Sequence, residues 1–200
     1  MSSFRVIGSR APMVGSTAKA AGRARFATDM RLPGLLFGKV LRSTQAHARI
    51  VNIDVSAARK VPGVVTVVTG EDIPPGARYG TVRKDQTALA IDKVRFIGEE
   101  VAAVAATSRE AAEEAVERIV VEYDPLPACF TPEDALAEGA ALIHEDAPGN
   151  VAHRLRFEKG ESVDAALAAS DVVLEESFET RTQYHAFTEP NCTVADPTDG

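Results

Sequence analysis

A glutamine, a histidine and a glutamate towards the C-terminal end of the sequence have side chains that acid–base chemistry uses: Gln183, His185 and Glu189. Their spacing is even, so an unbroken strand would place all three on one face. A carboxylate beside an imidazole can exchange a proton with it in general acid–base catalysis. The same three side chains would also suit a buried hydrogen-bonded network, and the spacing leaves both interpretations open.

A second candidate site surrounds His47, which stands close to Arg42, Ser43 and Arg49 in the sequence. This group predicts either an anion-binding site or a histidine that hydrogen-bonds a loop. No metal site is indicated, because no histidine stands three or four residues from another histidine or from a cysteine. The four histidines are His47, His144, His153 and His185.

The other polar candidates are expected to be structural. Cys129 and Cys192 are too few for a disulfide scaffold or an iron–sulfur cluster, and no histidine near Cys129 in the sequence would activate its thiol. Glu99 and Glu100 are adjacent carboxylates, which a strand would point in opposite directions, so we expect a solvated turn there. The glycines lack the spacing of a phosphate-binding loop.

Composition and charge limit the class of protein. The 200 residues are 45% hydrophobic and 26% charged, which excludes a disordered chain. The longest apolar run, residues 101–106, is far shorter than a membrane span. The 22 basic and 29 acidic residues give a net charge of −7, so bulk charge does not attract nucleic acid or an anionic membrane. The N-terminus shows no secretory signal, and we expect a cytoplasmic protein.

The periodicity of the first two thirds predicts an α+β fold rather than a doubly wound sheet. Residues 1–34 are an irregular arm with frequent glycine and proline. Within residues 35–130, short strands are interrupted by an amphipathic helix at 109–118, capped by Ser108. The expected strands cover residues 35–41, 48–55, 64–69, 94–97, 101–106 and 119–123, and a short helix capped by Ser56 covers 57–60.

A helix is predicted over 132–138 at the beginning of residues 131–200, because Thr131 and Asp134 give a start that resembles a capping box. A second helix is predicted at 163–169. Strands are predicted at 171–180, with one acidic face, and at 192–195. The turn residues at 196–200 then predict a hairpin whose returning strand is missing. We therefore expect a fragment, or one piece of a split protein.

Seven short motifs follow one another along the first two thirds of the chain: VLRSTQAHARI at 40–50, IDVSAA at 53–58, VPGV at 61–64, VTGEDI at 68–73, DKVRFIGE at 92–99, VAAV at 101–104 and VEYDPLP at 121–127. Together they resemble the hammerhead domain of the xanthine dehydrogenase and aldehyde oxidase family. Asn150, the helix pattern at 160–171 and QYHAFTEP at 183–190 resemble the start of the molybdenum-binding region that follows. Thr44 departs from the family, which usually has proline there.

The resemblance implies a hammerhead domain at 35–130 and the beginning of an α+β molybdopterin-binding domain at 131–200. It implies the large subunit of an enzyme with a molybdenum–molybdopterin cofactor, in the cytosine dinucleotide form. Iron–sulfur clusters and FAD would be on partner subunits or domains. Such enzymes insert oxygen derived from water into aldehydes, purines or N-heteroaromatics. The segments 79–89 and 126–136 are most similar to bacterial members such as 4-hydroxybenzoyl-CoA reductase, which removes a hydroxyl group instead.

The family's catalytic glutamate, the glutamine beside the molybdenum and the pterin-binding loops all follow the position that corresponds to residue 200. The resemblance therefore implies no catalytic or metal-binding residue in this sequence, and no activity of the chain alone. It gives Gln183, His185 and Glu189 a supporting position at the edge of the molybdenum domain. The alternative function is a non-catalytic module that docks iron–sulfur and flavin partner subunits.

Overall fold

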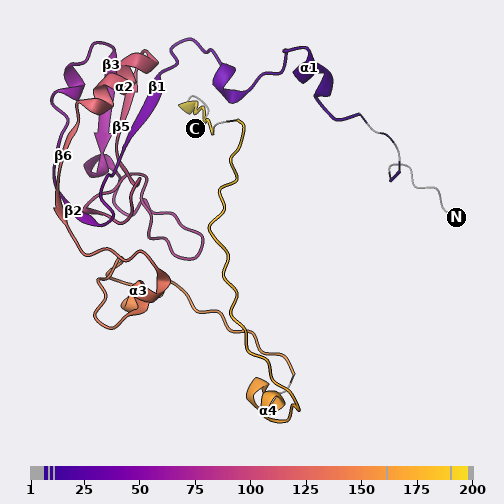
Figure 1. The fold of residues 1–200 in the computed structure, drawn as a ribbon. Coiled ribbons are helices and arrows are strands. Elements are labelled where there is room, and N and C mark those ends of the chain that lie inside the picture. Colours follow the sequence, from indigo (N-terminus) through magenta and orange to yellow (C-terminus); the bar gives the residue numbers. More distant parts are fainter. Residues whose placement is uncertain (1–6, 9, 11, 161, 190, 198–200) are drawn as a thin grey trace. The chain divides into compact units, whose positions relative to one another are not determined.

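The computed structural model describes residues 7, 8, 10, 12–160, 162–189 and 191–197. The chain divides into a compact unit, Gly34–Asp171, and a second unit that combines Met1–Pro33 with Val172–Gly200. Every strand that the described residues form belongs to the compact unit (Figure 1). Its mixture of strands and helices confirms the predicted α+β class.

Two three-stranded antiparallel sheets form the centre of the compact unit. The first has the order β1 (Phe37–Arg42), β5 (Glu100–Ala106) and β3 (Val64–Thr69); the second has the order β4 (Lys93–Val94), β2 (Ala48–Asp54) and β6 (Val120–Pro125). Among these strands, no two that are consecutive in sequence pair with each other. Ala48 of β2 lies opposite both Val94 and Pro125, so β4 and the end of β6 flank the first residues of β2 on its two edges.

Helix α2, Arg109–Glu117, confirms the helix predicted at 109–118 and packs on the first sheet. Its first turn forms because the Ser108 hydroxyl accepts a hydrogen bond from the Ala111 amide at 3.1 Å. Ala112 and Ala115 are buried against the sheet, and such small side chains let the helix lie close to the strands. The buried core on this side contains Ala58, Val61, Val67, Ala102, Val104, Ala106, Ala111, Ala112, Ala115 and Ile119.

Strand β2 contains a bulge where the sequence predicts simple alternation. The pairing with β6 passes over Val51, since Ile50 lies opposite Tyr123 and Asn52 opposite Glu122. Ile50 is therefore half-buried on the same side as the later apolar residue Ile53, whereas Val51 is exposed. An unbroken alternation through 48–55 would put Ile50 and Ile53 on opposite faces, and the bulge brings them to the same side.

Strand β4 is shorter than the predicted strand at 94–97. The Arg95 amide donates a hydrogen bond to the Glu99 carboxylate, and the chain turns back through Gly98, whose φ is 94°. The side chain of Phe96 consequently lies exposed in the turn instead of in a sheet.

The predicted helix at 57–60 is a single 3₁₀ turn, Ala58–Lys60, and Ser56 does not cap it. The Ser56 amide instead donates a hydrogen bond to the Asp54 carboxylate at 2.8 Å. This bond turns the chain directly after β2, so the short helix begins one residue later than predicted.

The chain after β6 folds into a compact loop, residues 126–152, which we call the junction segment. It contains helix α3, Pro132–Leu136, and a 3₁₀ turn, Pro148–Asn150. The predicted N-terminus of α3 is confirmed, because the Thr131 hydroxyl accepts a hydrogen bond from the Asp134 amide at 3.0 Å. The helix ends at Leu136 rather than at 138.

Helix α4, Val163–Ala168, confirms the last predicted helix, and all described side chains of residues 152–171 are exposed. In the second unit, the described residues form helix α1, Ser16–Ala20, and a 3₁₀ turn, Ala27–Asp29. The strands predicted at 171–180 and 192–195 are wrong for the described residues, where neither segment has a strand beside it to bond with. The last residues of the predicted turn, 198–200, lie outside the described residues. None of the helices in the described chain is long and apolar enough to cross a membrane.

Candidate functional site

The three side chains that the sequence places on one strand face do not share a face in the structure. Gln183, His185 and Glu189 are exposed, and Ala186 between them has a φ of 49°, a left-handed conformation that breaks the alternation of a strand. The His185 ring stacks on Phe187, with ring centroids 5.6 Å apart. No hydrogen bond joins the three polar side chains within the described part of the chain. Their predicted supporting role therefore stays a prediction.

His47 is a buried residue that bonds a loop. Its side chain is 4% exposed, and Nδ1 lies 2.7 Å from the carbonyl oxygen of Pro127. Because a carbonyl only accepts, Nδ1 carries the proton of this hydrogen bond. Arg42, the cation expected nearby, pairs instead with Glu100 at 2.6 Å. The structure favours the loop-bonding interpretation over the anion site.

The adjacent carboxylates Glu99 and Glu100 have different surroundings, and the predicted solvated turn is wrong for Glu99. Its side chain is 15% exposed and accepts a hydrogen bond from the Arg95 amide. Burial raises the pKa of the Glu99 carboxyl above its usual value, against the opposing effect of Arg95. Glu99 is thus part of the fold's polar interior.

A buried lysine holds the junction segment against the second sheet. Lys93 of β4 is 2% exposed, and its ammonium donates hydrogen bonds to the Glu145 carboxylate at 2.7 Å and to the Leu142 carbonyl at 3.3 Å. The hydrogen bond from Lys93 lowers the pKa of Glu145 to about 2. A buried ammonium without such partners would be strongly unfavourable, so the burial of Lys93 depends on the position of residues 142–145.

Arg83, in the loop between β3 and β4, is a second attachment point. Its guanidinium lies 2.5 Å from the Asp146 carboxylate and donates to the Asp146 carbonyl at 3.1 Å. On its other side it lies 3.7 Å from the Asp85 carboxylate. Lys93 and Arg83 therefore hold two adjacent residues of the junction segment, Glu145 and Asp146.

Asn150 closes the junction segment on itself. Its side-chain oxygen accepts from the Ile143 amide at 2.9 Å, and its side-chain nitrogen donates to the carbonyls of Ala135 at 2.9 Å and Ala141 at 3.0 Å. Its φ of 57° is left-handed, a conformation that asparagine adopts more readily than most residues. One amide group thus fixes three positions of the loop.

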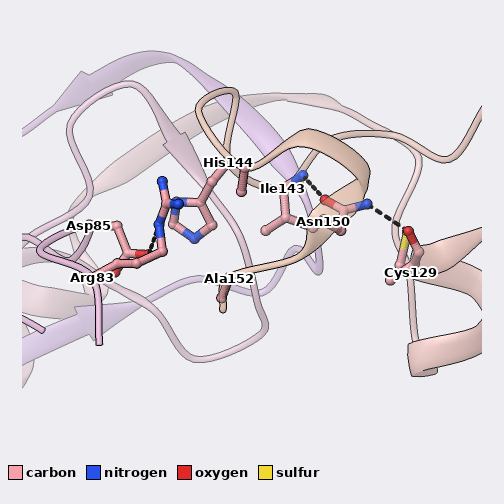
Figure 2. A pocket seen from close by; sticks show the side chains of 9 residues that line it. Arg83, Asp85, Cys129, Ile143, His144, Asn150 and Ala152 are labelled. Atoms are coloured by element: carbon pink, nitrogen blue, oxygen red, sulfur yellow. Dashed lines mark hydrogen bonds and ion pairs between the residues drawn. The ribbon is translucent and has the colours of Figure 1, made fainter. Parts of the chain in front are cut away.

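A pocket of about 240 Å³ lies between these contacts, with Arg83, Asp85 and His144 at one end and Cys129 and Asn150 at the other (Figure 2). Burial, helped by the charge of Arg95, lowers the pKa of His144 below its usual value. The polar groups around the pocket hold the chain in place, and no reacting pair is assembled there.

The described residues do not build a site for a molybdenum–pterin group by themselves. Within them, no group of three or more histidine, cysteine, aspartate or glutamate side chains could hold a metal ion. Gln183, His185 and Glu189 share no face that could support such a group. We therefore assign no reaction step to these side chains.

The attachment points carry little signal in the sequence. Lys93 and Glu145 are 52 residues apart, and lysine is ordinarily an exposed residue. Arg83 and Asp146 are separated by 63 residues. The one local sign is the pair Gly149–Asn150, whose residue types favour a turn.

Comparison with known proteins assigns both parts of the chain. The model of the aldehyde oxidase and xanthine dehydrogenase a/b hammerhead domain matches residues 21–127, more than half of the chain. The chain belongs to the aldehyde oxidase and xanthine dehydrogenase family. A molybdopterin cofactor-binding domain matches residues 143–200 of this family member, so the resemblance predicted from its motifs is confirmed.

Curated relatives are similar over most of the chain. A probable xanthine dehydrogenase subunit of Bacillus subtilis (strain 168) is 44% identical over 181 residues, which cover 90% of this chain and 24% of the relative. The nicotinate dehydrogenase large molybdopterin subunit of Eubacterium barkeri is 39% identical over 192 residues, or 96% of this chain and 44% of the relative. The chain thus spans less than half the length of these two relatives.

Solved structures show the same fold. Reconstituted CO dehydrogenase from Oligotropha carboxidovorans superposes with a TM-score of 0.73 at 36% identity, covering 82% of this chain and 22% of that one. Quinoline 2-oxidoreductase from Pseudomonas putida 86 gives a TM-score of 0.59 at 42% identity, with 65% and 17% covered.

Proposed function

We propose that the chain is the N-terminal part of the large, molybdopterin-binding subunit of a molybdenum hydroxylase. The observation that carries this proposal is the order of the two matched domains, a hammerhead domain followed by a molybdopterin cofactor-binding domain. Relatives whose names specify a molybdopterin or molybdenum-binding subunit are similar over nearly all of the chain.

The proposed reaction of the complete protein is the insertion of oxygen from water into an aldehyde or an N-heteroaromatic ring. The names of the relatives support this class, because xanthine, nicotinate and quinoline are nitrogen heterocycles. Reductive dehydroxylation of an aromatic CoA thioester, as in 4-hydroxybenzoyl-CoA reductase, is the other direction that the motifs suggest. In this proposal, the described residues orient and support the rest of the molybdopterin-binding subunit, and they provide no reacting group.

The proposed cofactor is molybdenum–molybdopterin in its cytosine dinucleotide form, and the proposed location is the cytoplasm. Iron–sulfur and FAD subunits or domains would be the electron-transfer partners, and relatives named as subunits of larger complexes support a multi-subunit protein. The proposed domains are an arm at 1–34, the hammerhead at 35–130, and a linker with the start of the molybdopterin domain at 131–200. Gln183, His185 and Glu189 are proposed as supporting residues of that last part.

A docking module without a cofactor is the second candidate function. It is favoured by the exposed apolar turn of the compact unit, where the side chains of Phe96 and Ile97 are 55% and 66% exposed. Exposed apolar residues that protrude together are typical of a surface that contacts another chain. In this case the hammerhead would recruit partner subunits and bind no molybdenum.

Metal analysis with dye-coupled assays separates the two functions. We expect the complete protein to contain stoichiometric molybdenum and to oxidise an aldehyde or an N-heteroaromatic, and the 200-residue chain to contain none. A complete protein that assembles with its partners but lacks molybdenum would contradict the hydroxylase and support the docking module. Stoichiometric molybdenum in residues 1–200 alone would contradict the supporting role given to these residues.

A further inference from the structure

The hammerhead domain contains a buried cation whose acceptors lie outside the matched hammerhead stretch, which ends at residue 127. The Lys93 ammonium donates to the Leu142 carbonyl and to the Glu145 carboxylate, and the described residues offer it no other acceptor. Glu145 lies in the stretch matched by the molybdopterin-binding domain, and Leu142 lies directly before that stretch. The charge of a hammerhead residue is therefore satisfied by the start of the next domain.

The position of β4 depends on this lysine. β4 has only two residues and pairs with β2 over two positions. Directly before it, the Asp92 carbonyl accepts a hydrogen bond from the Ile50 amide at 2.9 Å. Val94, directly after Lys93, is 0% exposed in the core of the second sheet. A strand with so few bonds leaves its neighbour if the ammonium beside it moves out to water.

The turn that follows β4 is attached to the same lysine. The Arg95 guanidinium donates a hydrogen bond to the Lys93 carbonyl at 3.0 Å, and the Arg95 amide donates one to the Glu99 carboxylate. The exposed side chains of Phe96 and Ile97 lie between these two bonds in the sequence. The position of Lys93 thus also fixes the turn 95–99.

The loop that carries both acceptors is held by Asn150. Its side-chain amide bonds the backbone of Ala135, Ala141 and Ile143, and all three bonds end inside the junction segment. Leu142 lies between the last two of these positions. Asn150 therefore holds the acceptors in place without contacting the lysine through its side chain.

Lys93 and Glu145 do not depend equally on their contact. The lysine is 2% exposed, whereas the glutamate side chain is 68% exposed. Release of residues 142–145 would hydrate the carboxylate but leave the ammonium buried without an acceptor, which is strongly unfavourable. The free-energy penalty of an unfolded loop thus falls on the hammerhead domain.

We propose that the folding of β4 and of the turn 95–99 is coupled to the folding of the first residues of the molybdopterin-binding domain, and that Lys93 transmits this coupling. While residues 142–150 are unfolded, the ammonium turns out to water and draws β4 away from β2. The hammerhead domain then lacks one edge of its second sheet and a fixed turn. The inference goes beyond the proposed function and holds whether or not the complete protein contains molybdenum.

Hydrogen exchange of the complete protein tests the coupling, with the Ile50 amide as the probe because it bonds the carbonyl next to Lys93. Asn150→Gly removes three hydrogen bonds that all lie within the junction segment, and glycine tolerates the φ of 57°. It should speed exchange at Ile50 by about tenfold and leave the amides of β5 unchanged. Unchanged exchange at Ile50, or equal acceleration at Ile50 and in β5, would overturn the proposal.

The variant Lys93→Met removes the charge that needs an acceptor. In this background Asn150→Gly should leave exchange at Ile50 unchanged, because methionine stays buried whether or not residues 142–145 are in place. Acceleration of the same size in both backgrounds would show that the loop acts on β4 without the lysine, which would overturn the proposal.

Glu145→Ala provides a second variant, which removes the carboxylate acceptor and leaves the bonds of Asn150 in place. It should also speed exchange at Ile50. The matched control is Ser170→Ala, which removes a 2.8 Å hydrogen bond to the Ala166 carbonyl within the same matched domain. The control should leave exchange at Ile50 as in the wild type. Equal exchange at Ile50 in these two variants would overturn the proposal.

Discussion

The Lys93 ammonium and the Glu145 carboxylate lie 2.7 Å apart although 52 residues separate them in the sequence. The lysine side chain is 3% exposed and the glutamate side chain 68%, so the pair joins a buried cation to a hydrated anion. The cation has lost its water and depends on its protein partners, whereas the anion could be solvated without it. Replacing Lys93 and replacing Glu145 should therefore change the free energy of unfolding by different amounts.

Glu145→Gln should lower the free energy of unfolding by about 1–2 kcal/mol, towards the low end for a charged hydrogen bond because the carboxylate is largely exposed. In a Lys93→Met background the same change should have little effect, because no buried charge then needs a partner. Urea denaturation of the wild type, both single variants and the double variant measures this coupling. An effect of equal size in both backgrounds would show that the pair is not coupled.

Acid should weaken the same pair. The pKa of Glu145 is lowered from 4.5 to about 2, so its contribution to stability is fully present above 4.5 and is lost as the pH falls through about 2. The urea midpoints of the wild type and Glu145→Gln should therefore converge as the pH approaches 2. If the urea midpoints of the two proteins, plotted against pH, stay the same distance apart down to that pH, the assignment of the low pKa to this pair is wrong.

Glu99 should behave in the opposite sense. Burial raises the pKa of Glu99 above 4.5, because it disfavours the charged carboxylate. The contribution of the protonated Glu99 carboxyl to stability is therefore fully present below pH 4.5 and is lost as the pH rises through the raised pKa. An NMR titration of the Glu99 carboxyl carbon measures this pKa. A midpoint at or below 4.5 would contradict the burial argument.

Two replacements of Asn150 separate its hydrogen bonds from its backbone conformation. Asn150→Gly removes the three side-chain hydrogen bonds but tolerates the φ of 57°, and should cost about 1–3 kcal/mol. Asn150→Ala loses the same bonds and adds left-handed strain of about 1 kcal/mol. Thermal unfolding should rank the proteins wild type, Gly and Ala, in falling order. If the alanine variant is as stable as the glycine variant, the positive φ carries no cost.

The buried face of α2 is tested by Ala115→Asp. Ala115 is 0% exposed, so the new carboxylate would be buried without a partner and should lower stability by about 3–5 kcal/mol. Glu117→Asp, on the exposed side of the same helix, should change stability by less than about 0.5 kcal/mol. A melting temperature unchanged by Ala115→Asp would contradict the packing of α2 on the sheet.

Glu189→Gln in the complete protein tests the proposed supporting role. If the residue belongs to a buried network there, stability should fall by about 1.5–3 kcal/mol while turnover per folded molecule stays the same, which is the result we expect. Lower turnover with unchanged stability would place Glu189 beside the cofactor cavity instead. Melting temperature, molybdenum content and turnover, measured on one preparation, distinguish these results.

Elements with a local cause could be predicted from the sequence. Ser108 and Thr131 cap helices through bonds to residues three positions away, and those helix starts are confirmed. The bulge at Val51 depends on how β2 meets β6, which no local pattern contains. The segment 171–180 has the alternation of a strand, but alternation does not supply a neighbouring strand.

The candidate site was the least predictable part for the same reason. The junction segment is held by cations whose partners are 52 and 63 residues away, and each of these residues is ordinary in its local sequence. The residues that acid–base chemistry would favour, Gln183, His185 and Glu189, are exposed and unconnected within the described chain. Family motifs located both domains, but they did not indicate which residues fasten one to the other.

The strand order has a consequence for how the protein is made. Since no two consecutive strands of the described chain pair, neither sheet can begin as a hairpin while the polypeptide emerges from the ribosome. β1 must wait for β5, and β2 for β4 and β6, so the second sheet is incomplete until Pro125 has been synthesised. The early strands leave the ribosome with their apolar faces uncovered. We therefore expect the nascent hammerhead to fold late, and chaperones that bind extended apolar segments to determine its yield.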